Sequence, residues 1–434
     1  MDSPRSFDVL IIGAGLAGLV AGLDLTRRGH SVVIVERRST WGGLCGTFRL
    51  DGHEFVIACN DFGQGLVRAL AELEVPVRFE QKKTRVSHGD LTFDLPLDVR
   101  SAARVLRYAP DLGRFLLGLR RYRRGAGGEH YLGPLVERAV RSDVAADLLK
   151  LPAYLMGVHP DDFRLEALFE DAAFDYGYTR PAAPVGGPQV LADALAAKFR
   201  ERGVLLLSTE CLGVERLDGR SVARTSAGPI AARVVLLADG RAAPRENDKL
   251  GLPLSALCLA VAKDLPYPAR IHTLVHYPPG ISAWFGAIDA GRPAREFGFH
   301  LFRSDLPEKP DHYTMNAYCY LPRGDEDPTE ETVRRVEEYI LASAEGMIPG
   351  LRRALRYKRF ISPRAFTALH GLSSRVTPVI SPPGARRSPN YDPATDAYAA
   401  GGAAFPPGDH AGAAVLSARI AARMIAERLS QQAA

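Results

Sequence analysis

The chain has few cysteines, and those it has are scattered. Of its 434 residues only five are cysteine, and no two of them form a CxxC pair. The histidines do not cluster at metal-ligand spacing either. A disulfide framework and a structural zinc site are therefore not expected. We expect no metal, and a protein of the reducing cytoplasm.

Long hydrophobic runs are also lacking. Arg, Asp or Gly interrupts every apolar stretch before it reaches the ~20 residues that span a bilayer. The first residues, MDSPRSFDVLII, lead directly into a predicted strand, without the basic and apolar segments of a secretion signal. The sequence thus predicts neither a transmembrane anchor nor export.

A large excess of one charge is absent as well. There are 55 basic and 50 acidic residues, and the resulting net charge of +5 is too weak to indicate nucleic acid as a partner. A hydrophobic content of 46% over this length is ordinary for a globular protein. The chain is long enough for two domains or one composite fold that buries a large cofactor.

What is present begins with a dinucleotide motif. Residues 7–12 predict a buried strand, 16–28 a helix ended by Gly29, and 31–35 a second strand. Between the first strand and the helix lies GxGxxG, whose glycines permit a tight turn, close approach of a pyrophosphate, and helix–strand packing. Helix-start N–H groups then bind the phosphates. The predicted site comprises Gly13, Gly15, Leu16, Ala17 and Gly18.

An acidic residue follows at the expected place. Glu36 ends the second strand, 18 residues after Gly18, with Arg37 next to it. A carboxylate there accepts hydrogen bonds from both ribose hydroxyls of an adenosine and repels a 2′-phosphate. We expect Glu36 and Arg37 to lie at the adenosine end of the cofactor.

The chain after Glu36 does not continue like a nicotinamide-binding domain. Trp41-Gly42-Gly43-Leu44 is followed by FRLDGHEF at 48–55, which predicts two antiparallel strands around a turn. These segments, with PVGG at 184–187, CLGVERL at 211–217 and GGAAFPPGDHAG at 401–412, resemble the phytoene desaturase and flavin amine oxidase superfamily. Their order along the chain is more specific than any one of them, and the regions that they mark make up about half of the chain.

The resemblance implies FAD, with non-covalent binding expected. It places Gly42, Gly43 and Leu44 along the pyrophosphate and ribityl chain, and the backbone of Val214 at the adenine. A helix N-terminus near the flavin would stabilise the negative charge of the reduced ring. The resemblance gives this role to the C-terminal segment through Gly402, Gly408, Ala411, Gly412 and Ala413.

Four residues are candidates for substrate contact or catalysis. Asp409 and His410 lie beside the predicted flavin loop, and Cys59 and Asp61 lie where the excursion after Glu36 returns to the cofactor. Each has a structural alternative: His410 as a helix cap, Cys59 as a buried small hydrophobe, and Asp61 as the cap of a helix that starts near Gln64.

Residues 97–124 are basic and apolar together. Eight arginines interleave with leucine, valine and phenylalanine, and Pro110 divides the stretch into two helices. Two interpretations stay open: peripheral contact with the inner face of a membrane, or a solvated helix face.

The expected fold is α/β: a discontinuous Rossmann-like FAD-binding domain with an inserted α+β substrate domain that contains a mixed or antiparallel sheet. Further expected elements are a helix over 188–200, strands over 203–207 and 233–237, a helix capped at Asp327-Pro328, and a final helix over 411–429. The FAD-binding segments are 1–75, 185–260 and 365–434, and the substrate segments are 76–184 and 261–364.

The expected function is FAD-dependent dehydrogenation or desaturation of a hydrophobic, polyene-like molecule, with hydride transfer to flavin N5. A flavin amine or amino-acid oxidase that releases peroxide is the main alternative. A flavin-dependent double-bond reductase, isomerase or monooxygenase, a redox-inactive flavoprotein and a nicotinamide-dependent Rossmann enzyme also stay open.

Overall fold

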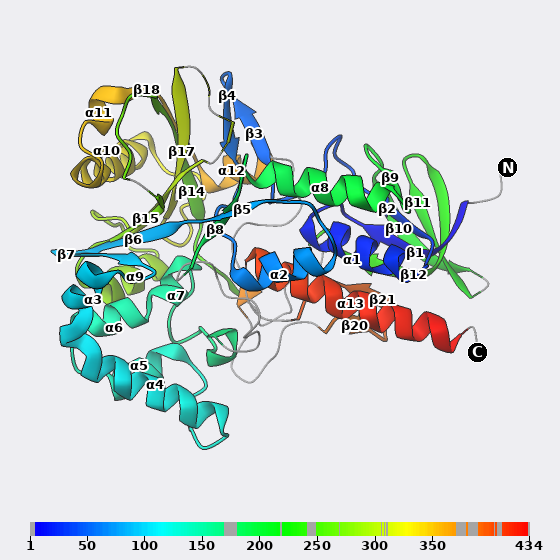
Figure 1. Cartoon of the computed structure of the whole chain (residues 1–434), viewed down its shortest axis with the longest axis horizontal. Coiled ribbons are helices and arrows are strands. Elements are labelled where there is room, and N and C mark those ends of the chain that lie inside the picture. The colour runs from blue at the N-terminus through cyan, green and yellow to red at the C-terminus, as the bar shows by residue number, and fades with distance from the viewer. Residues whose placement is uncertain are drawn as a thin grey trace.

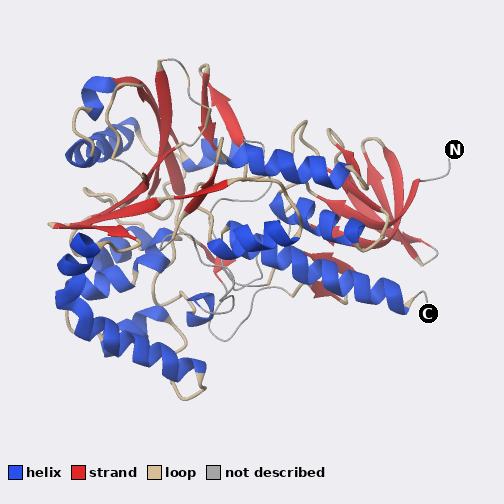
Figure 2. Ribbon diagram, in the orientation of Figure 1, coloured by secondary structure: helices blue, strands red, loops and turns tan. Residues whose placement is uncertain are grey.

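The structure is a computed structural model with two main sheets, drawn in red in Figure 2. It describes residues 5–168, 180–217, 219–240, 249–268, 270–304, 306–307, 309, 311–369, 379–380, 389–402, 404–405 and 410–432. Both chain ends lie beside the first sheet, whereas the second sheet and a group of helices occupy the other end of the molecule (Figure 1).

The first sheet has a parallel centre. Its parallel strands lie in the order β9 (Val204–Leu206), β2 (Val32–Val35), β1 (Arg5–Ile12), β12 (Gly228–Leu237) and β21 (Ala397–Ala399). Antiparallel strands β10 (Cys211–Leu217), β11 (Arg220–Thr225) and β20 (Tyr391–Asp392) extend it. The carboxyl ends of β2, β1, β12 and β21 therefore share one edge.

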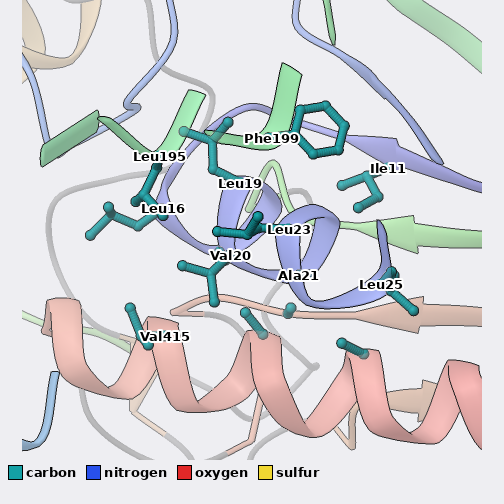
Figure 3. Packing of buried hydrophobic residues seen from close by; sticks show 14 of the residues in the cluster. Ile11, Leu16, Leu19, Val20, Ala21, Leu23, Leu25, Leu195, Phe199 and Val415 are labelled. Carbon is teal, nitrogen blue, oxygen red and sulfur yellow. The ribbon is translucent and has the colours of Figure 1, made fainter. Parts of the chain in front are cut away.

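Helices cover one face of this sheet: α1 (Leu16–Arg27), α2 (Gln64–Glu72), α8 (Pro188–Arg200) and α13 (Ala411–Gln431). In β1, Ile11 joins the helix-covered core, while Leu10 joins a separate cluster on the opposite face, as the two-residue strand period requires. Within α1, Leu19 lies toward Phe199 of α8 and Val20 lies toward Val415 of α13 (Figure 3).

The second sheet is mostly antiparallel. Its order is β18 (Leu355–Ile361), β14 (Leu254–Ala262), β17 (His312–Tyr320), β16 (Phe299–Arg303), β15 (Ile271–Tyr277), β6 (Lys83–His88) and β7 (Leu91–Leu95). Only the β15–β6 pair is parallel. The predicted fold class is confirmed. The expected segment boundary at residue 260 falls inside β14, which belongs entirely to this second sheet.

Different elements pack on the two faces of the second sheet. One apolar cluster includes residues of α9 (Ile281–Asp289), α10 (Glu330–Met347) and α11 (Leu351–Ala354). The other includes residues of the hairpin β3 (Thr47–Leu50) and β4 (His53–Val56) and of α12 (Pro363–Leu369). The expected cap of α10 was wrong. The Thr329 hydroxyl accepts from the backbone N–H of Thr332 at 3.3 Å, whereas Asp327 lies two residues earlier and pairs with Arg364.

A helical layer adjoins this sheet. It comprises α3 (Val99–Val105), the 3₁₀ turn Leu106–Tyr108, α4 (Ala109–Arg123), α5 (Leu132–Ala139), α6 (Asp143–Leu149), α7 (Leu151–Leu155) and the 3₁₀ turn Leu165–Leu168. The break expected at Pro110 is present, with the proline in the first turn of α4. Two short pairs, β5 (Phe79–Gln81) with β8 (Ala182–Pro184) and β13 (Lys249–Leu250) with β19 (Val379–Ile380), complete the described elements. Among the described helices, none is both long and apolar enough to span a bilayer.

Within the second sheet, His300 is buried and His276 is half-buried. The Nε2 atom of His300 is 2.8 Å from the Tyr277 hydroxyl, and that of His276 is 3.2 Å from the Tyr339 hydroxyl. Burial lowers the pKa of His300 to about 3. Burial, together with the nearby His88, lowers the pKa of His276 to about 4. Both rings are therefore neutral in the folded protein at neutral pH.

This burial predicts acid-dependent stability. In the unfolded chain a histidine takes up a proton near pH 6.5, so below that pH the unfolded state binds more protons and the free energy of unfolding falls. Between pH 7 and pH 5, each of the two histidines should lower the free energy of unfolding by about 2 kcal/mol. In urea unfolding, the free energy of unfolding of His300→Gln should fall between pH 7 and pH 5 by about 2 kcal/mol less than that of the wild type. The exposed His130→Gln serves as control. An unchanged pH dependence in His300→Gln would contradict the assignment.

Candidate functional site

The candidate site begins at the shared edge of the first sheet. Parallel pairing brings together the loops that follow β1, β2, β12 and β21. Backbone hydrogen bonds align them: Gly13 N–H donates to Val35 O at 2.8 Å, Ala238 N–H to Ile12 O at 2.9 Å, and Ala400 N–H to Leu237 O at 2.9 Å. In open parallel sheets such an edge is where ligands bind.

The three glycines of the motif differ in what surrounds the position of a missing Cβ atom. Gly13 has φ +106°, and a Cβ there would lie 2.8 Å from the Ala238 carbonyl oxygen. A Cβ at Gly18 would lie 1.9 Å from the Gly13 carbonyl oxygen. Packing of the protein itself thus requires both glycines. Gly15 differs, because its φ is −74° and its Cβ would meet nothing nearer than the Gly43 Cα atom at 3.9 Å. Apart from that atom and the chain neighbours of Gly15, no atom of the described residues lies within 4 Å of this position beside the first turn of α1.

Glu36 lies at the end of β2 beside this turn. Its carboxylate accepts from the backbone N–H of Ala14 at 2.9 Å and from that of Arg38 at 3.0 Å. It is half-buried, whereas Arg37 is exposed. Glu36 is therefore fixed against the glycine turn with part of its carboxylate accessible.

The segment after β9 passes the end of β2. Thr209 N–H donates to Glu36 O at 2.8 Å there. Val214 lies further along the chain on β10, opposite Ala223, and is 40% exposed. The structure thus joins Thr209 directly to Glu36, and the expected contact of Val214 with the adenine stays a prediction.

The Gly42–Gly43 loop lies against the glycine turn. Gly42 N–H donates to Ala14 O at 2.8 Å, and a Cβ on Gly43, which has φ +59°, would lie 3.1 Å from the Gly15 Cα atom. Leu44 then leads to the next part of the site, because its carbonyl accepts from the Cys59 N–H at 3.4 Å. The segment after β4 is thus joined to the dinucleotide turn through this loop.

Side chains from β17 hold the segment 56–61, which we call the return loop. The Tyr318 hydroxyl lies 2.8 Å from Ile57 O, and the Asn316 amide donates to Val56 O at 2.6 Å. Both side chains are buried, and burial raises the pKa of Tyr318, so its hydroxyl remains a donor. Neither residue was predicted. Their signal is a buried Asn and Tyr two positions apart, on one face of an otherwise apolar strand.

Side chains from β15 hold the other end of the return loop. The Thr273 hydroxyl donates to Asp61 Oδ2 at 2.6 Å. His272 Nε2 lies 3.0 Å from Asn60 O and 3.6 Å from Asp61 Oδ1, and the side chains of His272 and Asp61 are each 4% exposed. A carbonyl oxygen only accepts, so this nitrogen carries the proton. The expected capping role of Asp61 was wrong: α2 begins after Gly63 without a side-chain cap.

Cys59 lies beside another thiol. Burial raises the pKa of Cys45 well above its ordinary value, and the neighbouring Cys59 raises it further. Cys45 also donates to Pro188 O at 3.4 Å. Cys59 itself is half-buried against the core of the first domain, and both thiols are free. This packing supports the structural interpretation of Cys59.

The C-terminal part of the site rests on α13. Gly401 has φ +103°, and its N–H donates to the Ser417 hydroxyl at 3.1 Å, which also accepts from the Asn390 amide at 3.1 Å. These contacts hold Gly401 near the first turn of α1, where its Cβ would lie 3.5 Å from Ala17 Cβ, and leave Gly402 exposed. Asn390 and Ser417 were not predicted, although a serine interrupts the alanine-rich face of α13.

His410 caps α13 in the structure. Its Nδ1 atom accepts from the Ala413 N–H at 3.3 Å, which fixes the neutral tautomer with the proton on Nε2. Ala411, Gly412 and Ala413 are buried in the first turn. Asp409 and Gly408 lie outside the described residues. Within the described ranges no group of three or more His, Cys, Asp or Glu side chains has the arrangement of a metal site.

Comparison with known proteins agrees with this geometry. A family model described as an NAD(P)-binding Rossmann-like domain matches residues 11–61. The chain is 29% identical to hydroxyneurosporene desaturase of Cereibacter sphaeroides, over 69% of this chain and 67% of that protein. It is 24% identical to phytoene desaturase (lycopene-forming) of a Paracoccus species over 99% of both. The chain is thus similar, along most of its length, to desaturases of the phytoene desaturase and flavin amine oxidase superfamily of FAD-dependent oxidoreductases.

Solved structures share the fold of this chain. Cyclohexylamine oxidase from Brevibacterium oxydans has a TM-score of 0.66 at 16% identity, covering 98% of this chain and 99% of that one. An oxidoreductase from Methanosarcina mazei has a TM-score of 0.64 at 18% identity, covering 95% and 99%. At such identities the likeness concerns the fold.

The residues present fit a dinucleotide. Among the described residues, a Cβ at Gly15 would meet only the Gly43 Cα atom within 4 Å, which agrees with the close approach of a pyrophosphate at this position of the motif. The first turn of α1 supplies backbone N–H groups there, and Glu36 stands where ribose hydroxyls would donate.

This geometry predicts that substitution of Gly15 affects FAD binding, whereas substitution of Gly18 affects the stability of the fold. In the flavin-free protein, Gly15→Ala should change the free energy of unfolding by less than about 1 kcal/mol. Its affinity for added FAD should fall at least about tenfold, equivalent to 1.4 kcal/mol. Gly18→Ala should instead destabilise the flavin-free protein by about 1–3 kcal/mol, because a backbone oxygen must move. Urea unfolding and flavin titration measure the two quantities. Equal destabilisation by both substitutions, with FAD binding retained in Gly15→Ala, would contradict this division.

Proposed function

We propose that the protein binds FAD without a covalent bond and dehydrogenates a hydrophobic, polyene-like small molecule. The observation that carries the proposal is the open position beside Gly15, next to which lie Glu36 and the Gly42–Gly43 loop. Backbone hydrogen bonds connect this loop through Leu44 to the return loop. A redox cofactor spread along this path would have its adenosine at the first sheet and its reactive ring near the second.

Different residues would hold different parts of the cofactor. The first turn of α1 binds phosphate, and Glu36 accepts from ribose. The backbone of Thr209 would lie beside Glu36 at the adenosine end, and the contact of Val214 with the adenine stays a prediction. The first turn of α13, which His410 caps, places a partial positive charge beside Gly402. Bound FAD would supply the two-electron acceptor, with the electrons passing on to oxygen or another acceptor.

The return loop would face the reacting end of the substrate. Its position is fixed from four side chains of the second sheet, so the loop is pre-organised rather than adjustable. Ile57 of the loop and Phe55, which precedes the loop, are fully buried and exclude water from this part of the site. We therefore propose that Cys59 and Asn60 shape the site and do not react.

The substrate class follows from the relatives. The two proteins with the longest matches described above are named as desaturases, one of hydroxyneurosporene and one of phytoene. Molecules of this kind dissolve in membranes, so the proposal includes peripheral contact of residues 97–124 with the cytoplasmic side of a membrane. The proposal keeps segments 1–75, 185–260 and 365–434 for the cofactor and segments 76–184 and 261–364 for the substrate. The one exception is β14, which goes with the substrate segments because it lies in the second sheet.

Dehydrogenation removes a hydride and a proton from adjacent carbons. Of the candidates that the structure describes, we propose the Asp61–His272 pair as the group that accepts the proton, through the return loop or an intervening water. His410 is less suited because its Nδ1 atom is engaged by α13. Asp409 remains a candidate for substrate contact.

The proposal is tested first by the absorption spectrum. The purified protein should show flavin bands that pass to the supernatant after acid precipitation. Anaerobic addition of an acyclic polyene should then bleach the bands, whereas amines should not. Bleaching by an amine with peroxide release in air would favour the oxidase alternative. A colourless protein that gains no bands with added FAD would overturn the proposal.

The proton assignment has its own test. Asp61→Asn keeps an oxygen that accepts from the Thr273 hydroxyl but removes the charge. The anaerobic rate of flavin reduction should fall by about 10²–10⁴-fold and lose its pH dependence. The matched control is Thr273→Val, which removes the hydroxyl and keeps the carboxylate, and it should retain the pH profile. If both variants lower the rate equally and keep the profile, Asp61 only positions the loop.

A further inference from the structure

The loop that carries Gly42 and Gly43 contacts α8 as well as the glycine turn. A Cβ on Gly42 would lie 3.0 Å from Ala192 Cβ, and a Cβ on Gly46 would lie 3.1 Å from Gln189 Oε1. The Cys45 thiol donates to the carbonyl oxygen of the first α8 residue at 3.4 Å. The first two turns of α8 therefore support residues 41–46, which we call the 41–46 loop.

Trp41, the first residue of this loop, makes two further contacts with α8. Its indole Nε1–H donates to Asp193 Oδ1 at 2.8 Å, and the same oxygen accepts from the Gln189 amide at 2.8 Å. The Arg200 guanidinium lies 4.6 Å from the centre of the Trp41 ring. Asp193 and Arg200 are seven residues apart, which places them on the same side of the helix, two turns from each other. The indole thus lies along α8, between an acceptor and a cation.

The helix that holds Trp41 is itself firmly packed. Leu191, Leu195 and Phe199 of α8 are fully buried in the core of the first domain. A Cβ on Gly22 of α1 would lie 2.9 Å from Phe199 Cε2, so α1 and α8 are in close contact. Because close-packed helices shift little relative to each other, α8 can fix the 41–46 loop relative to the first turn of α1.

The contacts of Trp41 with Asp193 and Arg200 contribute little to the fold. Both partners are exposed, and among the described residues neither of them forms an ion pair. Single contacts of exposed charged groups stabilise a folded protein only weakly. Their main effect is therefore local, on the position of the loop that begins with Trp41.

We propose that Trp41 is a positioning residue for FAD, because its contacts with α8 hold Gly42 and Gly43 against the glycine turn before the cofactor binds. The inference rests on the proposed function, since it concerns the same cofactor path. A loop that is already in its binding conformation loses little conformational freedom when the ligand arrives, whereas a loosened loop must be ordered at the expense of affinity. Trp41 acts through the loop and not on the reacting atoms.

Trp41→Phe tests the hydrogen bond, because it removes the indole N–H and keeps an aromatic ring beside Arg200. In flavin titration of the flavin-free protein, its dissociation constant for FAD should be about fivefold higher than that of the wild type. The matched control is Trp284→Phe in α9. Trp284 is also half-buried, and its Nε1–H donates to Glu296 O at 2.7 Å. This control should bind FAD like the wild type.

Substitution of Asp193 tests the same contact from its other partner. Asp193→Ala should weaken FAD binding to the same extent as Trp41→Phe. Asp193→Asn keeps an oxygen that accepts from the indole, so it should recover most of the affinity. Alanine and asparagine are both tolerated at an exposed helix position, and circular dichroism shows whether each variant is folded.

Hydrogen exchange without flavin separates loop positioning from a general loss of stability. In the flavin-free protein, the backbone amides of the 41–46 loop should exchange about fivefold faster in Trp41→Phe than in the wild type or in Trp284→Phe. Unchanged exchange in Trp41→Phe would overturn the proposal. So would equal FAD affinities of Trp41→Phe and the wild type, or an equal loss of affinity in Trp284→Phe. A wild type that binds no FAD at all would be a different result, because it contradicts the proposed function and with it this role of Trp41.

Discussion

Parallel pairing of β12 with both β1 and β21 is the interaction on which the candidate site depends. Strand β21 comes some 160 residues after β12 in the chain, yet its pairing places Gly401 and Gly402 at the same sheet edge as Gly13 and Gly15. Without it, the first turn of α1 and the first turn of α13 would not converge. Their convergence gives a negatively charged cofactor two helix N-termini.

A second constraint joins the two sheets. The return loop leaves the first domain after the β3–β4 hairpin and is held by Asn316 and Tyr318 from β17 and by His272 and Thr273 from β15. Buried hydrogen bonds of this kind are costly to break, because each leaves a polar group without water. The loop therefore fixes the second sheet relative to the cofactor edge of the first sheet. The proposed hydride transfer from substrate to cofactor requires such fixed positions.

The sequence by itself determined the dinucleotide turn, Glu36, the Gly42–Gly43 loop, the hairpin at 48–55, the helix over 188–200 and the fold class, because each depends on local periodicity or on a motif of adjacent residues. Tertiary structure decided the rest. It joined Thr209 to Glu36, gave Asp61 a partner in Thr273 rather than a helix to cap, and moved β14 into the second sheet. It also brought in His272, Asn316, Tyr318, Asn390 and Ser417, whose hydrogen bonds reach across the fold. Contacts between residues hundreds of positions apart depend on strand order and register, and no local pattern in the chain encodes them.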